Sequence, residues 1–284
     1  MKKYLSCDLC AAGEPRFVLE SKGLDGPLVE CVRCGLRYVG ARKKGLTFGT
    51  GEAPDTAEKV RQANTQFRYL RLEEEHRLAL LNAKWRLKLI REFRPGGRLL
   101  EIGCARGDFL RLAQESYDTC GVEPNPELAE FASRIAPVHP DIIERAPWFG
   151  FDVIASFHVL EHVDSPRSFV RAAAARLKPG GVLVLETPDI DSLPYKILKS
   201  RWRQFIPEHY FFFDPKTIAR LLTDNGLKVQ RVLRIGKYAS VDLILNRLSR
   251  YLSWMPQPDG FSRLTFRVNP MDIMLVFATR SAGE

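Results

Sequence analysis

Two glycines bracket a turn of small residues that can hold a ligand close to the main chain. Gly103 and Gly107 follow a predicted buried strand and precede a predicted helix, with Cys104 and Ala105 between them. Such a turn brings main-chain N–H groups at the start of a helix within reach of a ligand. Glu101 lies two residues before the first glycine, and its negative charge favours a cationic ligand over a pyrophosphate.

A second acidic residue indicates that the ligand carries a nucleoside. Glu123 ends the next apolar segment, about twenty residues after Gly103. An acidic side chain at the end of the second strand can accept hydrogen bonds from both hydroxyls of a ribose. The two acids and the glycine turn together predict a nucleoside-bearing cofactor with a positively charged group.

Four cysteines near the N-terminus predict a metal site. Cys7 and Cys10 form one C-x-x-C pair, and Cys31 and Cys34 form a second pair about twenty residues later. Two such turns can supply four thiolates in tetrahedral geometry, as in a structural zinc site. Disulfides and a redox pair are the alternatives, and the lack of an apolar signal segment argues against disulfides. The segment has few apolar residues, so zinc would supply much of its folding free energy.

The elements that must position these residues follow an α/β pattern. From residue 98 to about 190, apolar strand segments alternate with helical segments, which predicts a Rossmann-like, doubly wound, mostly parallel sheet. Ligands bind at the carboxyl ends of the strands in such folds. We expect three parts: a zinc-binding module over 1–40 with a short hairpin, a linker and helical cap over 41–93, and a cofactor-binding domain over 94–284 with a last strand at 272–278.

Two further segments flank the predicted site. Residues 41–57 have the composition of a linker or a mobile lid, and residues 58–93 carry apolar side chains, such as Leu70 and Leu78, near helical spacing. Residues 240–255 have an amphipathic helical pattern. That helix either packs over the substrate cleft or contacts a membrane surface.

Three motifs in order along the chain resemble those of the class I S-adenosylmethionine-dependent methyltransferases. The glycine turn resembles the family's acid-x-Gly-x-Gly-x-Gly motif, with Ala105 in place of the middle glycine. Residues 151–163 resemble the fourth strand and the short helix after it, and residues 177–188 resemble the fifth strand with its Lys-Pro-Gly-Gly turn. The resemblance covers about residues 85–235. It implies the class I methyltransferase fold, S-adenosylmethionine as cofactor and methyl transfer as the activity.

The resemblance also implies which residues contact the cofactor. Glu123 and Pro124, after the second strand, would lie beside its ribose, and Asp141 and Ile142, after the third strand, beside its adenine. Phe157 and His158, after the fourth strand, would lie beside its methionine part. The residues of the glycine turn would also lie beside the methionine part: Glu101, Gly103, Cys104, Ala105 and Gly107. For His158 and for His162, packing at the start of a helix is the alternative.

A base is required when the methyl acceptor is a hydroxyl or an acidic C–H group. Glu208 and His209 follow the fifth strand in a Pro-Glu-His-aromatic stretch. We predict His209 as the base, and Glu208 as a residue that tunes its pKa or binds the substrate. The alternative is a structural pair that fixes the loop.

The order of the parts indicates a class of acceptor. A four-cysteine module followed by a Pro-Glu-His stretch resembles bacterial methyltransferases of sugar and natural-product pathways, above all nucleotide-sugar C-methyltransferases. Those enzymes are typically longer and carry a second C-terminal α/β domain, which a chain of this length is too short to hold. O-methylation is therefore at least as well supported as C-methylation. The expected acceptor is a sugar, a nucleotide-sugar or a secondary metabolite. The alternatives are an RNA methyltransferase, whose zinc module and basic surface hold nucleic acid, and a non-catalytic cofactor-binding protein.

Composition adds expectations about partners and location. The chain has 284 residues with 43 basic and 34 acidic side chains, which gives a net charge of +9. This excess favours an anionic or sugar-containing small molecule and leaves nucleic acid as a second possibility. The sequence has no apolar run of membrane-spanning length and no signal segment, so we expect a cytoplasmic enzyme with at most peripheral membrane contact.

Overall fold

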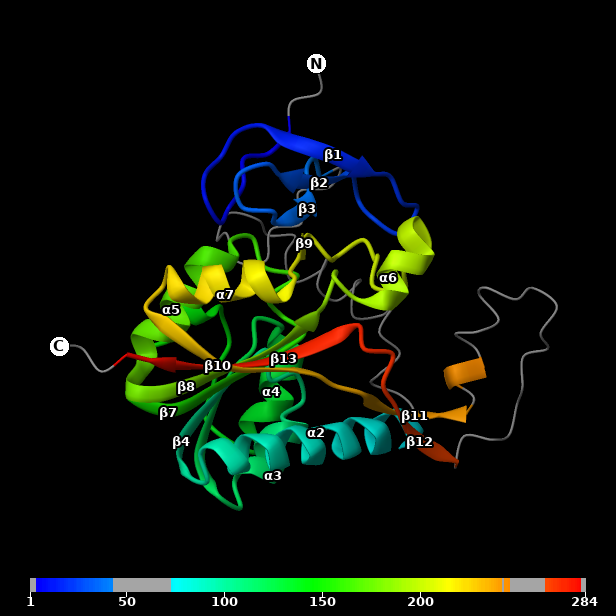
Figure 1. Cartoon of the computed structure of the whole chain (residues 1–284). Coiled ribbons are helices and arrows are strands. Elements are labelled where there is room, and N and C mark those ends of the chain that lie inside the picture. The colour runs from blue at the N-terminus through cyan, green and yellow to red at the C-terminus, as the bar shows by residue number, and fades with distance from the viewer. Residues whose placement is uncertain (1–3, 43–72, 242, 246–263, 282–284) are drawn as a thin grey trace.

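A seven-stranded mixed sheet forms the centre of the molecule (Figure 1). The computed structural model describes residues 4–42, 73–241, 243–245 and 264–281. The strand order is β10-β13-β8-β7-β4-β5-β6, in which β13 runs antiparallel to its two neighbours and the other adjacent pairs are parallel. The strands are β4 (Gly97–Ile102), β5 (Tyr117–Val122), β6 (Val138–His139), β7 (Phe151–Phe157), β8 (Leu177–Pro188), β10 (Leu227–Arg234) and β13 (Ile273–Arg280). This sheet confirms the predicted class I methyltransferase fold.

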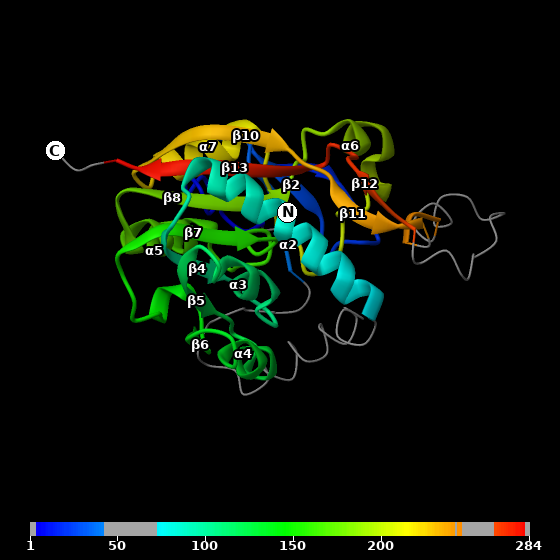
Figure 2. The ribbon, with the colours of Figure 1, turned by 90° about the horizontal axis from the view of Figure 1, so that it is seen from below.

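Helices cover both faces of the sheet (Figure 1). One face carries α2 (Glu73–Phe93), α3 (Asp108–Ala113) and α4 (Pro126–Ser133), and the opposite face carries α5 (Pro166–Arg176) and α7 (Pro215–Thr223). Several of these helices begin with a polar N-cap residue. The side chains of Asn125, Ser165 and Asp214 accept hydrogen bonds from main-chain N–H groups in the first turn, which have no partner within the helix. Figure 2 shows α2 running across the strands on its face.

The central strands are apolar on both faces because both faces are covered. On β4, Leu99 packs in the cluster beneath α2 and α3, and its neighbour Leu100 packs in the cluster on the other face. Both side chains are fully buried, which is worth about 1.5–3 kcal/mol each relative to exposure. The parallel register places Ile102 opposite Val122 on β5 and Ser156 on β7, so the carboxyl ends of three strands lie side by side.

The N-terminal segment forms a small antiparallel sheet that the methyltransferase domain completes. Its strands are β1 (Pro15–Leu19), β2 (Leu28–Cys31) and β3 (Arg37–Val39), and β9 (Phe211–Phe212) adds a fourth strand from the far end of the chain. The predicted hairpin is therefore present as β1 and β2. The module also packs into one continuous hydrophobic cluster with the domain, so its residues do not depend on a core of their own.

Some predicted elements differ from the structure or lie outside it. The short helix expected after the fourth strand is a turn at residues 160–162. His158 takes a φ of +56° at the end of β7, and the next helix starts only at Pro166. Most of the predicted linker at 41–57, Leu70 in the helical cap and most of the amphipathic segment at 240–255 lie outside the described residues. In the described part, β11 (Lys237–Ser240) pairs with β12 (Thr265–Val268). Among all the residues that the structure describes, no helix has the length and apolar content needed to cross a membrane.

Candidate functional site at the carboxyl ends of the strands

The turn after β4 depends on the small size of its residues. Gly103 has a φ of +75°, and a Cβ at this position would lie 2.5 Å from Cγ2 of Val159. Ala105 also takes a positive φ, +46°, at the place where the family motif has its middle glycine. Gly107, at a φ of +78°, is the N-cap of α3. The turn therefore brings its main chain to the end of the strand with little side-chain cover.

Two buried carboxylates lie beside this turn. Glu123 accepts hydrogen bonds from the main-chain N–H of Ala105 at 2.9 Å and of Asn125 at 2.9 Å, which fix its side chain. Each of its oxygens can accept a further bond, since a carboxylate has about four acceptor positions. Glu101 is 5% exposed, and its Oε2 has no hydrogen-bond partner among the described residues. Burial raises the pKa of both acids. An unpaired buried carboxyl oxygen fits the cationic end of S-adenosylmethionine.

Other residues of the predicted cofactor set surround the same strand ends. Cys104 is buried, and its Sγ fills the space where a Cβ on Gly121 would lie, so only its main chain can face a ligand. Asp141 binds the N–H of Ile142 at 2.8 Å and forms an ion pair with Arg145 at 3.0 Å. Pro124 is half-buried beside Glu123. The contacts of these residues with a cofactor stay a prediction.

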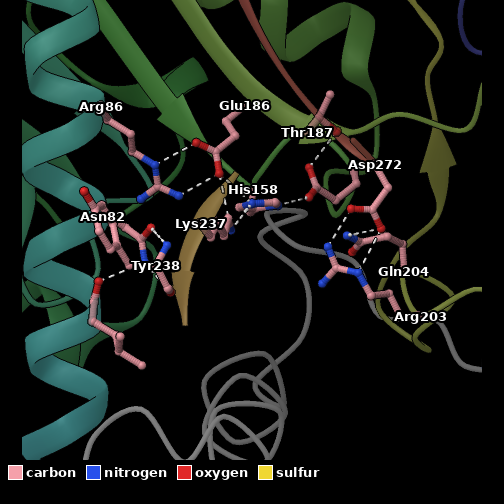
Figure 3. Close-up of polar contacts among 12 residues, drawn as sticks. Asn82, Arg86, His158, Glu186, Thr187, Arg203, Gln204, Lys237, Tyr238 and Asp272 are labelled. Carbon is pink, nitrogen blue, oxygen red and sulfur yellow. Dashed lines mark hydrogen bonds and ion pairs between the residues drawn. The ribbon is translucent and has the colours of Figure 1, made fainter. Parts of the chain in front are cut away.

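A polar network lies where β7 and β8 end beneath α2 (Figure 3). Arg86 of α2 donates two hydrogen bonds to the Glu186 carboxylate, at 2.7 Å each. Lys237 of β11 approaches the same carboxylate at 3.3 Å, and the Nε2 atom of His158 lies 2.7 Å from it. Lys237 Nζ is also in hydrogen-bond contact with His158 Nε2. Three nitrogen-bearing side chains thus converge on one fully buried acid.

His158 links this network to a second buried acid. Its Nδ1 lies 2.9 Å from Glu161, whose other carboxyl oxygen accepts a bond from Thr187 at 3.0 Å. Burial alone would raise the pKa of Glu161, but the bond with His158 and nearby positive charge lower it to about 2. The pKa of Glu186 also falls below its ordinary value, against burial, because of Arg86 and Lys237. Both acids are therefore ionised near neutral pH, with His158 between them.

The sequence motifs did not identify two members of this network. Arg86 lies on a long helix that precedes the glycine turn, and Lys237 lies on a short strand just before the predicted amphipathic segment at 240–255. Burial lowers the pKa of Lys237 to about 8, although Glu186 acts in the opposite direction. Glu186 does belong to the fifth-strand motif, and a charged residue in an otherwise apolar buried strand was the available signal. The half-buried Phe157 lies under Arg86, 4.5 Å from ring centre to guanidinium.

His209 and Glu208, the predicted catalytic pair, lie on the other side of Glu161. His209 is 5% exposed. Its ring contacts the ring of His162 edge-on and the ring of Phe212 at a tilt. Burial, reinforced by His162, lowers the pKa of His209 to about 3. An imidazole with so low a pKa is neutral but a weak base. The carbonyl of Glu208 binds the Nδ1 of His162 at 2.9 Å. The catalytic role of the pair stays a prediction.

The four predicted metal ligands come together in the module. Cys7, Cys10, Cys31 and Cys34 place their sulfur atoms within 4.8 Å of one another, and all four are free thiols. The sulfur atoms of Cys7 and Cys34 are 3.5 Å apart, and those of Cys10 and Cys31 are 3.4 Å apart. Gly35, at a φ of +78°, directly follows the second pair. Four thiols at these distances fit a tetrahedral zinc ion.

Comparisons with known proteins identify the family. A family model described as a methyltransferase domain matches residues 59–232, more than half of the chain. Magnesium protoporphyrin IX methyltransferase from Synechocystis PCC 6803, solved with bound S-adenosylhomocysteine, has a similar fold. The TM-score is 0.52 with 13% identity over 80% of this chain and 97% of that one. The chain belongs to the methyltransferase domain family, and it is an S-adenosylmethionine-dependent methyltransferase.

Two curated relatives have different acceptors in their names. The ubiquinone biosynthesis O-methyltransferase of Burkholderia pseudomallei (strain 1710b) is 26% identical over 205 residues, which cover 64% of this chain and 83% of that protein. The tRNA U34 carboxymethyltransferase of Desulfotalea psychrophila is 30% identical over 129 residues, 41% of this chain and 40% of that protein. One relative is named for a small-molecule pathway and the other for an RNA.

Proposed function

We propose that the enzyme transfers the methyl group of S-adenosylmethionine to a hydroxyl oxygen of a small molecule. The acceptor class is a sugar, a nucleotide-sugar or another hydroxylated metabolite, and C-methylation of such a molecule is the close variant. The observation that carries the proposal is His158, held between two ionised carboxylates where the strands end. The name of the B. pseudomallei relative, an O-methyltransferase, supports oxygen as the acceptor atom.

The cofactor supplies a methyl group on a positively charged sulfur, which is already activated for transfer. The residues that would hold it are the main chain of the 103–107 turn, Glu101 for its positive charge and Glu123 for its ribose hydroxyls. Asp141 and Ile142 would border the adenine, and Phe157 the methionine end. The enzyme's main contribution is then to align the acceptor with the transferred group and to exclude water.

His158 is the residue that we assign to the proton of the acceptor. Its side chain is 23% exposed, whereas Glu161 and Glu186 beside it are fully buried. With Nδ1–H donating to Glu161, the Nε2 atom would take up the proton of an acceptor hydroxyl that takes the place of Lys237 beside it, while the two carboxylates stabilise the charge that forms. Its positive φ is unusual for a residue other than glycine, and such strain is concentrated at functional sites.

Transfer of a radioactive methyl group tests the proposal. The full-length enzyme is incubated with labelled S-adenosylmethionine and separate pools of nucleotide-sugars, phenolic metabolites and total RNA. We expect labelling of a hydroxylated small molecule, and a 10²- to 10⁴-fold loss of rate in His158→Gln with little change in cofactor affinity. The surface histidine variant His76→Gln, whose side chain is 50% exposed, should retain full rate. Full activity of His158→Gln would contradict its assignment as the base.

RNA is the second candidate acceptor. The net charge of +9 and the similarity to a tRNA-modifying enzyme favour it. Binding to RNA that weakens steeply with salt, together with labelling of the RNA pool alone, would replace the small-molecule acceptor with this one.

We also propose that the four cysteines of the module hold a structural zinc ion. Support comes from the free thiols and from their mutual distances. All four positions around the metal are then filled by protein, so its contribution is to folding and not to methyl transfer.

A further inference from the structure

A pocket of about 450 Å³ lies between the N-terminal module and the methyltransferase domain. Strands β1, β2 and β3 form its module side, and α6 (Leu193–Leu198), the loop before α6 and the start of the 3₁₀ helix η3 (Lys199–Arg201) form the other side. Figure 1 shows α6 beside the end of β1. The pocket has the volume of a small-molecule site, and its lining contains none of the residues assigned above to the cofactor, the base or the zinc ion.

A row of three charged side chains crosses the module side of the pocket. Arg16 of β1 is paired with Glu30 of β2, and Glu30 is paired with Arg37 of β3, so the three side chains lie on one face of the sheet. Each oxygen of the Glu30 carboxylate accepts a hydrogen bond from one of the two arginines, at 2.8 Å. A guanidinium has five N–H donors, so both arginines keep donors for a further anion. Glu30 therefore orients two guanidinium groups side by side.

Two lysines add positive charge from the opposite side. Lys196 forms an ion pair with Asp191 at 2.7 Å. The Lys199 ammonium lies 5.7 Å from the centre of the Tyr195 ring, and the Arg37 guanidinium lies 5.6 Å from the same centre. The lining thus holds four cationic side chains and two carboxylates, an excess of two positive charges. A ligand with two negative charges would balance this excess, as a diphosphate can.

The rest of the lining suits the nucleoside end of such a ligand. Phe17 lines the pocket and is 50% exposed, so its ring is available to stack on a base. Ile190 also lines the pocket and follows β8, the strand whose Glu186 contacts His158. Four residues separate Glu186 from Ile190, and an extended chain of that length spans at most about 14 Å. The pocket therefore lies close to the strand end that carries the proposed base.

We propose that this pocket binds the diphosphate of a nucleotide-sugar, whose sugar is the methyl acceptor. The inference rests on the proposed function and narrows its acceptor class. Arg16 and Arg37 bind the phosphate oxygens from the module side, and Lys199 binds them from the domain side. The base lies against Phe17, and the sugar extends past the end of β8 toward His158. The module then has a second role, since it supplies half of the acceptor site.

Calorimetric titration with nucleoside diphosphates tests the site without knowledge of the sugar. Full-length protein is titrated with UDP, dTDP, GDP and ADP in turn, and with the matching nucleosides. We expect at least one diphosphate to bind, one molecule per chain, at least about 10-fold more tightly than its nucleoside. Lys199→Glu should weaken this binding by at least about 10-fold, and Arg16→Ala by about 3- to 10-fold. Lys216→Ala, which removes an exposed lysine of α7, should match the wild type.

Two results of this titration would overturn the site. One is the absence of diphosphate binding by the wild type, and the other is equal binding by the wild type and Lys199→Glu. Lys199 and Arg16 are both exposed, so neither variant removes a core side chain. Unchanged affinity for S-adenosylhomocysteine in both variants shows that the cofactor site is intact.

Methyl transfer then distinguishes an acceptor from a free nucleotide. With the nucleotide-sugar that is labelled in the pool, Lys199→Glu should raise KM by at least about 10-fold and leave kcat within about 2-fold. Weaker UDP binding with an unchanged KM would assign the pocket to a free nucleotide and overturn its role in acceptor binding. Labelling only of hydroxyl compounds without phosphate would overturn this inference and leave the proposed function standing. Labelling of RNA alone would contradict both.

Discussion

At the scale of single residues, two positions of the turn after β4 are restricted in different ways. Gly103 has no room for a side chain because Val159 occupies the space. Ala105 has a side chain but is held in a conformation that favours glycine. The first position is thus limited by packing and the second by the backbone.

Exchanging the residue types at these positions separates the two effects. Gly103→Ala should lower the free energy of unfolding by about 2 kcal/mol or more, because strain at a positive φ adds to the clash with Val159. Ala105→Gly should change it by less than about 1 kcal/mol, since relief of strain offsets the greater freedom of the unfolded chain. Urea denaturation of both variants gives the two values. Equal effects would show that the turn is not limited in this way.

Asp152 carries a pH-dependent part of the stability. Burial would raise its pKa, but Lys178 at 2.7 Å, the N–H of Arg98 at 2.9 Å and Arg94 at 3.0 Å lower the pKa to about 2. A carboxyl whose pKa falls on folding stabilises the native state above its unfolded pKa, near 4, and loses that effect as pH drops toward 2. Both cationic side chains are about half exposed, so solvent weakens the effect.

Asp152→Asn should therefore destabilise the protein by about 1–2 kcal/mol at pH 7. Denaturant unfolding of the variant and the wild type at pH 7, 5, 4 and 3 measures the difference. It should stay constant from pH 7 to 5 and shrink below 4. A difference that grows on acidification would contradict the assignment.

Sequence spacing could predict those site residues that belong to local motifs. Glu101 and Glu123 end consecutive parallel strands, so their neighbourhood follows from the fold pattern alone. Arg86 and Lys237 could not be predicted, because each reaches Glu186 from an element outside the motifs, 100 residues away in one case. The burial of His209 could not be predicted either, since it depends on ring contacts with His162 and Phe212.

At the scale of elements, the module depends on a strand that local patterns do not reveal. The β1–β2 hairpin could be predicted because its two strands are short apolar segments close together in the sequence. The two-residue β9 is too short to give a periodic signal, yet it pairs Tyr38 with Phe211 and Arg37 with Phe212. The main-chain N–H of Val39 also donates to the carbonyl of Tyr210. The module is thus built partly from the far end of the chain.

Loss of zinc should loosen the module without melting the central sheet. Cys31→Ala removes one of four ligands, so we expect loss of the ion and cleavage of the module by protease under native conditions. Strong chelation of the wild type should have the same effect. Cys120→Ala, which removes a thiol from β5, should keep one zinc per chain. Elemental analysis measures the zinc content, and limited proteolysis measures cleavage of the module. Wild-type protein that contains no metal would contradict the zinc proposal.

At the scale of the whole molecule, the alternation of strands and helices predicted the sheet because its central strands are apolar and buried on both faces. The strand order places β4 between β5 and β7, and this order brings the glycine turn, Glu123 and His158 to one edge of the sheet. The acceptor could not be predicted in the same way. It depends on side chains that converge from α2, β8 and β11, and on segments outside the described residues.

Calorimetric titration with S-adenosylhomocysteine tests the central claim most directly, namely that the strand ends hold this cofactor through Glu123 and the glycine turn. The wild type should bind one molecule per chain and should not bind NAD⁺, whose pyrophosphate would meet the Glu101 carboxylate. Glu123→Ala should bind 10- to 100-fold more weakly, because charged hydrogen bonds to the ribose are lost. Glu130→Ala, which removes an exposed acid on α4, should bind as the wild type does. Unchanged affinity in Glu123→Ala, or binding of NAD⁺ in place of S-adenosylhomocysteine, would contradict the account.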